Sequence, residues 1–198
     1  MGHGLSGTLA WTPRRSFRTM VTTIVFETHA LSWDNERGIA SGWAHGRLSE
    51  RGRRLAAELG ERRQNDGIAA VFSSDLRRAA ETAAIAFPSG TPPVLLDWRL
   101  RECDYGERNG GPADIDVRDR ACFLDEPYPG GESWRQAVAR VARWLDDLAL
   151  RWRGARVLVV GHVATRWALD HHLGGVALET LVAQDFAWQE GWEYRVPA

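Results

Sequence analysis

"VTTIVFETHALSWDN" (residues 21–35) begins as an apolar, β-branched segment and ends as a polar loop. Its first half, 21–27, predicts a buried strand because branched apolar side chains dominate it. A single histidine, His29, stands where that strand should end, between Thr28 and Ala30. An isolated histidine at a strand end is more often a packed or capping residue than a catalytic one. Other parts of the sequence are needed to distinguish a packed or capping histidine from a catalytic one.

The same pattern occurs again in "ARVLVVGH" (155–162), where an apolar strand ends at His162. Residue types and turn signals predict a further strand at 68–74, another within 92–100, and closing strands at 181–189 and 192–196. Helical periodicity and capping signals predict helices at 48–64, 74–87 (capped by Ser74 or Asp75), 132–152 and 163–175.

Strands that alternate with helices indicate an α/β fold, here a three-layer α/β/α sandwich with a mostly parallel central sheet. The active sites of such sheets lie beyond the carboxyl ends of the strands, which is where both histidines stand. The length of 198 residues fits one domain. We expect residues 1–20 to be a mobile extension, residues 21–198 to form the domain, and the Gly-, Pro- and Asp-rich stretch 104–131 to be an insertion that acts as a lid.

Charge and hydropathy exclude several classes of partner. The formal net charge is −1 and the pI is about 6.6, which argues against a nucleic-acid-binding protein. No apolar run approaches the roughly 18 residues that a membrane span needs, so we expect no membrane partner. Two cysteines are too few for a disulfide scaffold, and the cytoplasm is therefore the expected location.

Four segments of the sequence follow one another in an order that is informative about the family: "ETHALSWDN" (27–35), "SSDLRRAAETA" (73–83), "RLRECDYGE" (99–107) and "VVGHVATR" (159–166). With "LSERG" and "PGGES" between them, they resemble the histidine phosphatase superfamily, the phosphoglycerate-mutase-like enzymes. The resemblance runs over about residues 22–190, and the order of six motifs carries it rather than any single one.

The resemblance implies hydrolysis of a small phosphomonoester. His29 matches the nucleophile that forms a phosphohistidine, and Arg78 matches the arginine that grips the phosphoryl group. His162 matches the histidine that donates to a phosphoryl oxygen. Glu102 matches the general acid that protonates the leaving oxygen and then activates water. The set suits the reaction, because a phosphate ester needs a nucleophile, cationic donors and an acid.

By the same resemblance, Asn35, Ser41 and Gly42 line the phosphate site, and Tyr105 is an aromatic residue near the substrate. Val163 stands at the substrate site where the family usually has a glycine after the second histidine. These five residues, together with Thr28, complete the predicted substrate-binding set.

Thr28 is the main departure, because the family's first motif reads Arg-His-Gly. A hydrogen bond to a charged group contributes about 1.5–3 kcal/mol, so an unreplaced loss would cost roughly ten- to a hundredfold in binding. Three interpretations stay open. In the first, Arg37 or Arg166 replaces the missing arginine. In the second, the enzyme is a slow phosphatase with a special substrate, and in the third, the protein binds a phosphorylated ligand as a regulatory protein without turnover. Mutase-type phosphotransfer is less favoured because a second acidic group needs further cations.

The remaining signals favour structural roles. His171 and His172 end a polar helix and are expected to be solvated, and Cys103 is expected to pack as a small hydrophobe. No zinc pattern is present. We therefore expect no metal and no cofactor, and a small phosphorylated substrate as the partner. A monomer and a homodimer both stay open.

Ten tryptophans are an unusual number for this length. Trp33 and Trp43 flank the first catalytic loop, and Trp134 follows the "GGES" motif. Core packing is the favoured interpretation, and an aromatic wall for an apolar or ring-bearing substrate is the alternative.

Overall fold

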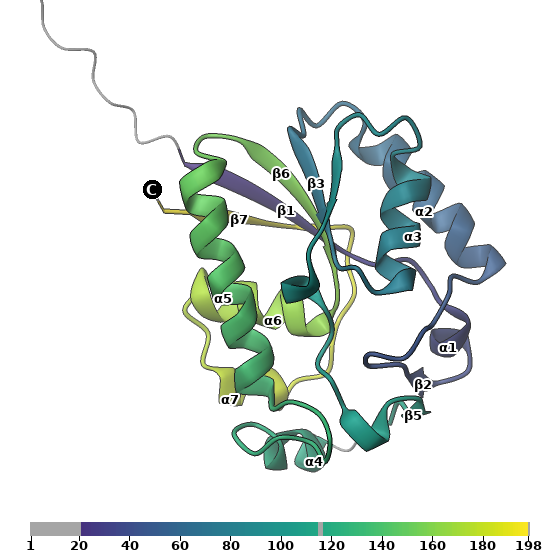
Figure 1. The fold of residues 1–198 in the computed structure, drawn as a ribbon, viewed down its shortest axis with the longest axis vertical. Coiled ribbons are helices and arrows are strands. Elements are labelled where there is room, and N and C mark those ends of the chain that lie inside the picture. The colour runs from purple at the N-terminus through teal and green to yellow at the C-terminus, as the bar shows by residue number, and fades with distance from the viewer. Residues whose placement is uncertain (1–20, 115–116, 198) are drawn as a thin grey trace, which may run out of the picture.

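A five-stranded sheet forms the centre of the protein, in a computed structural model that describes residues 21–114 and 117–197 (Figure 1). Its strand order is β4-β3-β6-β1-β7. β7 (Trp192–Val196) lies antiparallel to β1 at one edge. The other four are mutually parallel: β1 (Thr22–Thr28), β3 (Ala70–Ser73), β4 (Val94–Leu96) and β6 (Arg156–Gly161). The mostly parallel sheet that the sequence predicts is confirmed, whereas the prediction for residues 1–20 lies outside the described residues.

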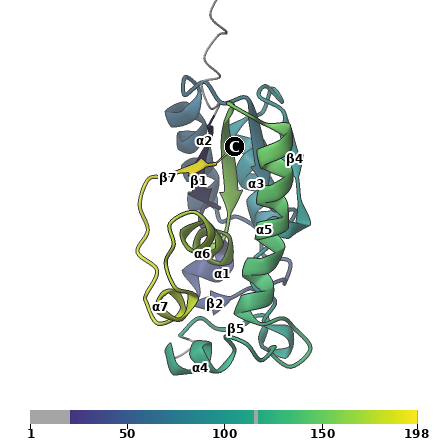
Figure 2. The ribbon, with the colours of Figure 1, turned by 90° about the vertical axis from the view of Figure 1, so that its left-hand side faces the viewer.

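Helices cover both faces of this sheet (Figures 1 and 2). One face carries α2 (Glu50–Arg63) and α3 (Arg77–Ala86), and the other carries α5 (Trp134–Arg151) and α6 (Val163–His172). Because side chains alternate along a strand, Val25 joins the apolar cluster beneath α2 and α3. Ile24 and Phe26 join the larger cluster beneath α5 and α6. The fold is therefore the predicted three-layer α/β/α sandwich.

The longest helix, α5, buries the stripe that its sequence predicts. The four stripe residues are at most 7% exposed: Val138, Val141, Leu145 and Leu148. A capping box begins the helix, since the Ser133 hydroxyl accepts the Gln136 N–H and the Gln136 side chain accepts the Ser133 N–H. Burial of this apolar stripe fixes α5 against the sheet.

Short elements follow the carboxyl ends of the strands. α1 (Trp33–Glu36) and β2 (Ile39–Ala40) come after β1, and α7 (Leu178–Val182) comes after α6. Between β4 and α5 lie η1 (Trp98–Leu100), η2 (Gly106–Arg108), β5 (Gly111–Pro112) and α4 (Val117–Cys122). β2 pairs antiparallel with β5, which joins the insertion 104–131 to the loop after β1. Figure 1 shows β2, β5 and α4 together at the lower end of the molecule.

The predicted strand at 181–189 is wrong. Leu178, Leu181 and Val182 are the buried residues of α7, and their spacing of three and four is helical. The residues that follow have no strand partner within the described chain. The sequence window began at the last turn of a short helix, so its apolar start resembled a strand.

The predicted cap of α3 is also wrong. The helix begins after Leu76, without a side-chain cap hydrogen bond. The Ser74 hydroxyl accepts the Leu76 N–H and so stabilises the turn before the helix. Asp75 instead binds Arg101 through two hydrogen bonds of 2.6 and 2.7 Å. Both side chains are engaged elsewhere, which leaves the amino end of α3 uncapped.

Candidate active site

Strand pairing brings the two strand-end histidines together. β1 and β6 are parallel neighbours with Thr28 opposite Gly161, so the next residues, His29 and His162, leave the sheet side by side. The His29 N–H donates to the Gly161 carbonyl at 2.9 Å. The centroids of the two imidazole rings lie 5.0 Å apart. Backbone register alone therefore creates a histidine pair at the carboxyl end of the sheet.

Arg78 links both imidazoles to the loop after β1. It lies in the first turn of α3, after the strand next to β6, and is 3% exposed. Its Nε donates to His29 Nε2 at 3.2 Å, and its Nη2 lies 3.2 Å from His162 Nδ1. Nη2 also donates to the Gly42 carbonyl at 2.9 Å. Burial lowers the pKa of Arg78, but arginine stays charged in proteins.

His29 is held in one tautomer. Its Nδ1 lies 2.7 Å from the Ala30 carbonyl oxygen, which can only accept, so Nδ1 carries the proton. The lone pair of the neutral ring is then on Nε2. Burial, followed by the charge of Arg78, lowers the pKa of His29 to about 3. At neutral pH, Nε2 is therefore an unprotonated nitrogen suited to nucleophilic attack.

His162 has the opposite tautomer. The Arg78 guanidinium only donates, so His162 Nδ1 accepts and the proton of the neutral ring is on Nε2. Burial lowers the pKa of His162 well below its usual value, and the charge of Arg78 adds to this effect. Nε2 is buried and has no hydrogen-bond partner among the described residues. A buried donor without a partner is costly, and an anionic oxygen would satisfy it.

Glu102 lies at the amino end of α6 and is 8% exposed. Its Oε1 accepts the N–H groups of Cys103 at 2.9 Å and Ala164 at 3.0 Å, and its Oε2 accepts that of Val163 at 3.2 Å. A helix amino end favours an anion, yet burial outweighs these bonds and raises the pKa of Glu102. A carboxyl group with a raised pKa can act as a general acid.

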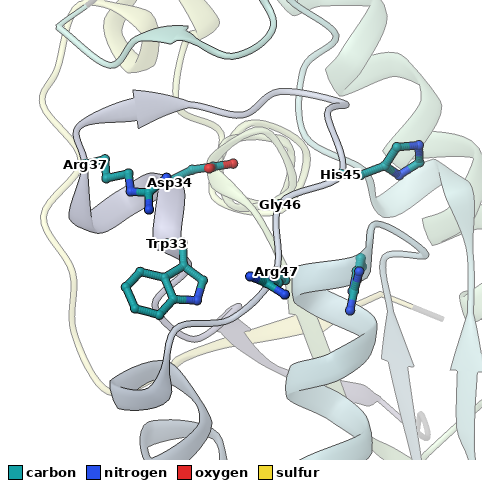
Figure 3. Close-up of a pocket in the computed structure, with 7 residues that line it drawn as sticks. Trp33, Asp34, Arg37, His45, Gly46 and Arg47 are labelled. Carbon is teal, nitrogen blue, oxygen red and sulfur yellow. The ribbon is translucent and has the colours of Figure 1, made fainter.

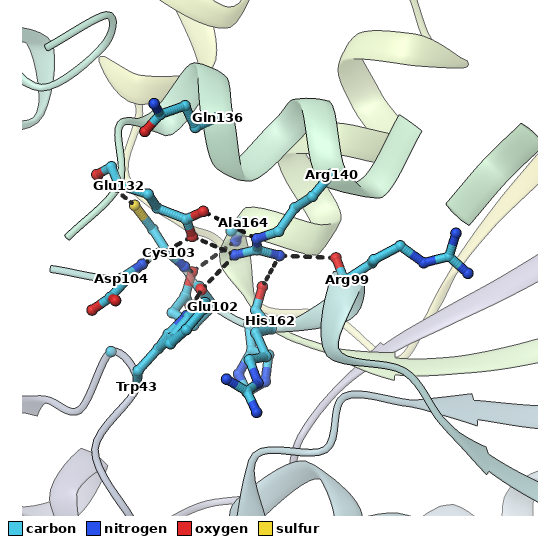
Figure 4. A network of polar contacts seen from close by, with 12 residues as sticks. Trp43, Arg99, Glu102, Cys103, Asp104, Glu132, Gln136, Arg140, His162 and Ala164 are labelled. Atoms are coloured by element: carbon cyan, nitrogen blue, oxygen red, sulfur yellow. Dashed lines mark hydrogen bonds and ion pairs between the residues drawn. The ribbon is translucent and has the colours of Figure 1, made fainter. Parts of the chain in front are cut away.

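Arg140 is a positioning residue that the sequence analysis missed. It is 2% exposed and donates from Nη2 to the Glu102 carbonyl and to Glu132 Oε1, both at 2.6 Å. Trp43 Nε1 donates to the same Glu102 carbonyl at 2.7 Å. Figure 4 shows these bonds converging on the segment that carries Glu102. Arg140 lies beside the apolar stripe of α5 and not within it, so no pattern in the sequence marks this role.

A cavity of about 370 Å³ opens at this place. The insertion contributes Ala113, Asp114 and Arg120 to its wall, and Trp134 and Trp167 are among its aromatic residues. Thus Trp134, 1% exposed as a whole, belongs both to the core and to the cavity wall. Eight predicted site residues line the cavity: His29, Asn35, Ser41, Gly42, Arg78, Glu102, Tyr105 and Val163. Thr28 and His162 do not line it.

The loop residues contribute mainly through their backbone and their fixed positions. Asn35 Oδ1 accepts from the Ser32 N–H and hydroxyl, which caps α1. The Ser41 hydroxyl donates to Asp34 at 2.7 Å. Gly42 has a φ of +50°, and a Cβ there would lie 1.9 Å from the side-chain oxygen of Asn109. Only glycine fits this turn, whose carbonyl holds Arg78.

Neither arginine proposed to replace the missing one lines the cavity. Arg37 lines a different hollow. Arg166 forms an ion pair of 2.8 Å with Asp170, and its guanidinium lies 4.3 Å from the centroid of the Trp192 ring. In this structure neither arginine is placed at the cavity wall.

Arg120, which comes from α4 in the insertion, does line the cavity. Its side chain is 15% exposed and lies 3.4 Å from the Asp185 carboxylate, whose own side chain is 97% exposed. Its Nη1 also donates to the Gln184 carbonyl at 3.2 Å. An ion pair with so exposed a partner is weak, so the guanidinium can exchange it for a ligand. No motif marks this arginine in the sequence.

The other polar candidates have structural surroundings. Cys103 is 0% exposed and packs in the core, as predicted. His172 is exposed, whereas His171 is half-buried and lies 2.8 Å from the Val176 carbonyl oxygen, contrary to the expectation that both are solvated. Within residues 21–114 and 117–197, no group of three or more His, Cys, Asp or Glu side chains is placed to hold a metal ion. Over the same residues, no helix combines the length and apolar character needed to cross a bilayer.

Comparison with known proteins identifies the family of this chain. The model of the histidine phosphatase superfamily (branch 1) matches residues 24–187. The chain belongs to this superfamily. The match spans all four residues around the cavity that the resemblance marked for chemistry, from His29 to His162.

The relatives within the superfamily are named for more than one enzymatic activity. A 2,3-bisphosphoglycerate-dependent phosphoglycerate mutase of Methylobacterium sp. is 34% identical over 179 residues, which cover 82% of this chain and 85% of the mutase. A solved mycobacterial glucosyl-3-phosphoglycerate phosphatase in complex with VO3 is 26% identical, with a TM-score of 0.72 and coverage of 82% and 87%. A solved protein of Bacillus stearothermophilus is 25% identical, with a TM-score of 0.75 and coverage of 87% and 90%. Both phosphatase and mutase activities therefore occur among the relatives.

We expect Arg140→Met to lower the free energy of unfolding by about 3–5 kcal/mol, because it leaves the Glu132 carboxylate without its buried partner. Denaturation in guanidinium chloride measures the change. Arg135→Met on the exposed side of the same helix is the matched control, and it should change stability by less than about 1 kcal/mol. Equal effects of the two substitutions would contradict a special role for Arg140.

Proposed function

We propose that the protein is a phosphatase that hydrolyses a small phosphomonoester through a phosphohistidine on His29. The observation that carries the proposal is the contact of His29 Nε2 with the Arg78 guanidinium at the wall of a cavity that also holds Glu102. A neutral nucleophile, a fixed cation and a buried acid are what the transfer of a phosphoryl group requires.

In the first step, His29 Nε2 attacks phosphorus while the bond from phosphorus to the leaving oxygen breaks. Arg78 transfers its donors from the imidazoles to the phosphoryl oxygens, which frees the Nε2 lone pair. Glu102, in the protonated form that its raised pKa favours, gives its proton to the leaving oxygen. The proton stays on Nδ1 and remains hydrogen-bonded to the Ala30 carbonyl, so the ring keeps its orientation while it becomes positively charged.

In the second step, water attacks the phosphohistidine and the bond between phosphorus and Nε2 breaks. The Glu102 carboxylate, now deprotonated, accepts a proton from this water and regains its starting state. The products are inorganic phosphate and the alcohol. Oε2 is the oxygen suited to both transfers, because it accepts one backbone N–H at 3.2 Å whereas Oε1 accepts two shorter ones.

Hydrolysis is favoured over mutase activity by the charge of the cavity. A mutase has to retain a second acidic group and reposition it, which calls for several cations. Among the described residues that line this cavity, Arg78 and Arg120 are the only arginines, and Asp114 and Asp185 add negative charge. We further propose that Arg120 supplies the second cation to the bound phosphomonoester, in place of the arginine that Thr28 replaces.

We expect wild-type protein to release phosphate from para-nitrophenyl phosphate or from a panel of sugar, nucleotide and amino-alcohol phosphates. His29→Ala should abolish release, and quenching the wild type with denaturant at alkaline pH, where phosphohistidine is stable, should trap phosphate bound to histidine. Phosphate release that survives His29→Ala would refute the mechanism. Ligand-induced thermal stabilisation without any release would instead favour the regulatory binding protein, and isomerisation of phosphoglycerate with added 2,3-bisphosphoglycerate would favour the mutase.

The pH dependence follows from two pKa shifts. His29 has a lowered pKa of about 3, so the nucleophile is neutral and active above that pH and is lost below it. Glu102 has a raised pKa, and the acid form is lost as the pH rises through it. We expect kcat/KM for an alkyl phosphate to fall on the alkaline side, and Glu102→Gln to reduce this rate far more than the rate with para-nitrophenyl phosphate. Equal losses for both substrates would exclude Glu102 as the acid.

Arg120→Ala should raise KM for the best substrate, and weaken inhibition by vanadate or phosphate, by roughly ten- to a hundredfold, because a charged donor is lost. Arg108→Ala is the matched control, since Arg108 lies in the same insertion but outside the cavity wall. Unchanged KM and inhibition in Arg120→Ala would show that the cavity needs no second cation.

A further inference from the structure

A second hollow lies on the other side of the loop that follows β1. Its volume is about 430 Å³, and none of its lining residues lines the catalytic cavity. α1, residues 45–47 and the first residue of α3 form its walls (Figure 3). A volume of this size is in the usual range for sites that bind small molecules.

The hollow is rich in cations. Arg37, Arg47 and Arg77 line it, all three exposed. None of the three forms an ion pair within the described residues, although eleven other arginines of that part of the chain do so. Asp34 is the single carboxylate in the lining, and its Oδ2 already accepts from the Ser41 hydroxyl. Three cations beside one carboxylate leave an excess of positive charge, which makes a favourable site for an anion.

The backbone around these arginines is fixed in place. The Ser32 capping box holds α1, and the Trp33 N–H donates to the Arg47 carbonyl at 3.1 Å. Gly46 passes so close to Asp34 that a Cβ there would lie 2.8 Å from its Oδ2. The hollow is therefore built on a preorganised loop, which reduces the entropy lost when a ligand binds.

Two further features extend the site. Arg77 is the first residue of α3, whose amino end has no side-chain cap, so the positive end of this helix adds to the charge of the arginines. Trp33 is 36% exposed, and the Arg37 guanidinium lies 5.7 Å from the centroid of its ring. The ring offers a flat apolar face beside the cations, as Figure 3 shows.

We propose that this hollow is a second binding site, separate from the site of chemistry, for a ligand that carries a chain of phosphate groups. Arginine forks bind phosphate oxygens in pairs, and three of them suit a ligand with several neighbouring phosphates. A nucleoside triphosphate would add a base that stacks on Trp33, whereas inorganic triphosphate would use the cations alone. The proposal does not depend on the phosphatase activity.

Isothermal titration calorimetry tests it on the full chain, in a His29→Ala background that prevents turnover, with inorganic triphosphate as the probe. We expect the double variant Arg47→Ala/Arg77→Ala to raise the Kd for inorganic triphosphate at least tenfold. Arg37→Ala/Arg47→Ala, which leaves the neighbour of Arg78 intact, should do the same. The matched control is Arg51→Ala/Arg54→Ala, which removes two exposed arginines of α2 outside the hollow and should change the Kd less than twofold.

Three results would overturn the proposal: no binding to the parent protein, equal weakening in the control, or loss of binding in Arg78→Ala with full binding in both test variants. The last result would place the ligand in the catalytic cavity.

ATP distinguishes the two ligand sources. Trp33→Ala should weaken ATP binding severalfold and leave triphosphate binding unchanged, and equal affinities for ATP with and without Trp33 would refute the stacking contact.

Discussion

The register of β1 against β6 is the constraint on which the site depends. Thr28 pairs with Gly161, and this one pairing sets His29 beside His162. A slip by one residue would displace one histidine from the other by about 3.3 Å and would turn the apolar residues of β1 to the opposite face. The slip would move Ile24 and Phe26 out of one packed cluster and Val25 out of the other, so the packing of both clusters opposes it. The hydrophobic core therefore sets the geometry of the polar site.

The two buried arginines differ in how their charges are balanced. Arg140 is neutralised by Glu132 and uses its remaining donors to hold the backbone around Glu102. Arg78 is bonded to imidazole nitrogens and to carbonyl oxygens, all of them neutral acceptors. Burial, followed by this charge, lowers the pKa of both histidines, and the charge is left uncompensated by any ion pair among the described residues. Such a cation favours an incoming anion, and the same imbalance explains the affinity for phosphate that we propose.

The sequence was sufficient to predict those parts of the protein whose residues follow a periodic pattern. The sheet, α5 and the strand-end positions of His29 and His162 follow from local residue types and from the rule for parallel sheets. Arg120 was not among the sequence candidates, Arg37 and Arg166, because its place at the cavity depends on where a long insertion folds back over the sheet. Arg140 was missed for a related reason: its partners lie elsewhere in the chain, and an arginine on a helix is by default a solvated charge.

The pairing of β2 with β5 has a consequence for motion. Two residues on each side join the insertion to the loop after β1, and the side-chain oxygen of Asn109 accepts the Trp43 N–H at 3.2 Å beside this junction. The same loop presents the Gly42 carbonyl to Arg78. A displacement of the insertion that widens the cavity mouth thus pulls on the support of the guanidinium itself. A change that loosens the pairing of β2 with β5 therefore also loosens the loop whose Gly42 carbonyl holds Arg78.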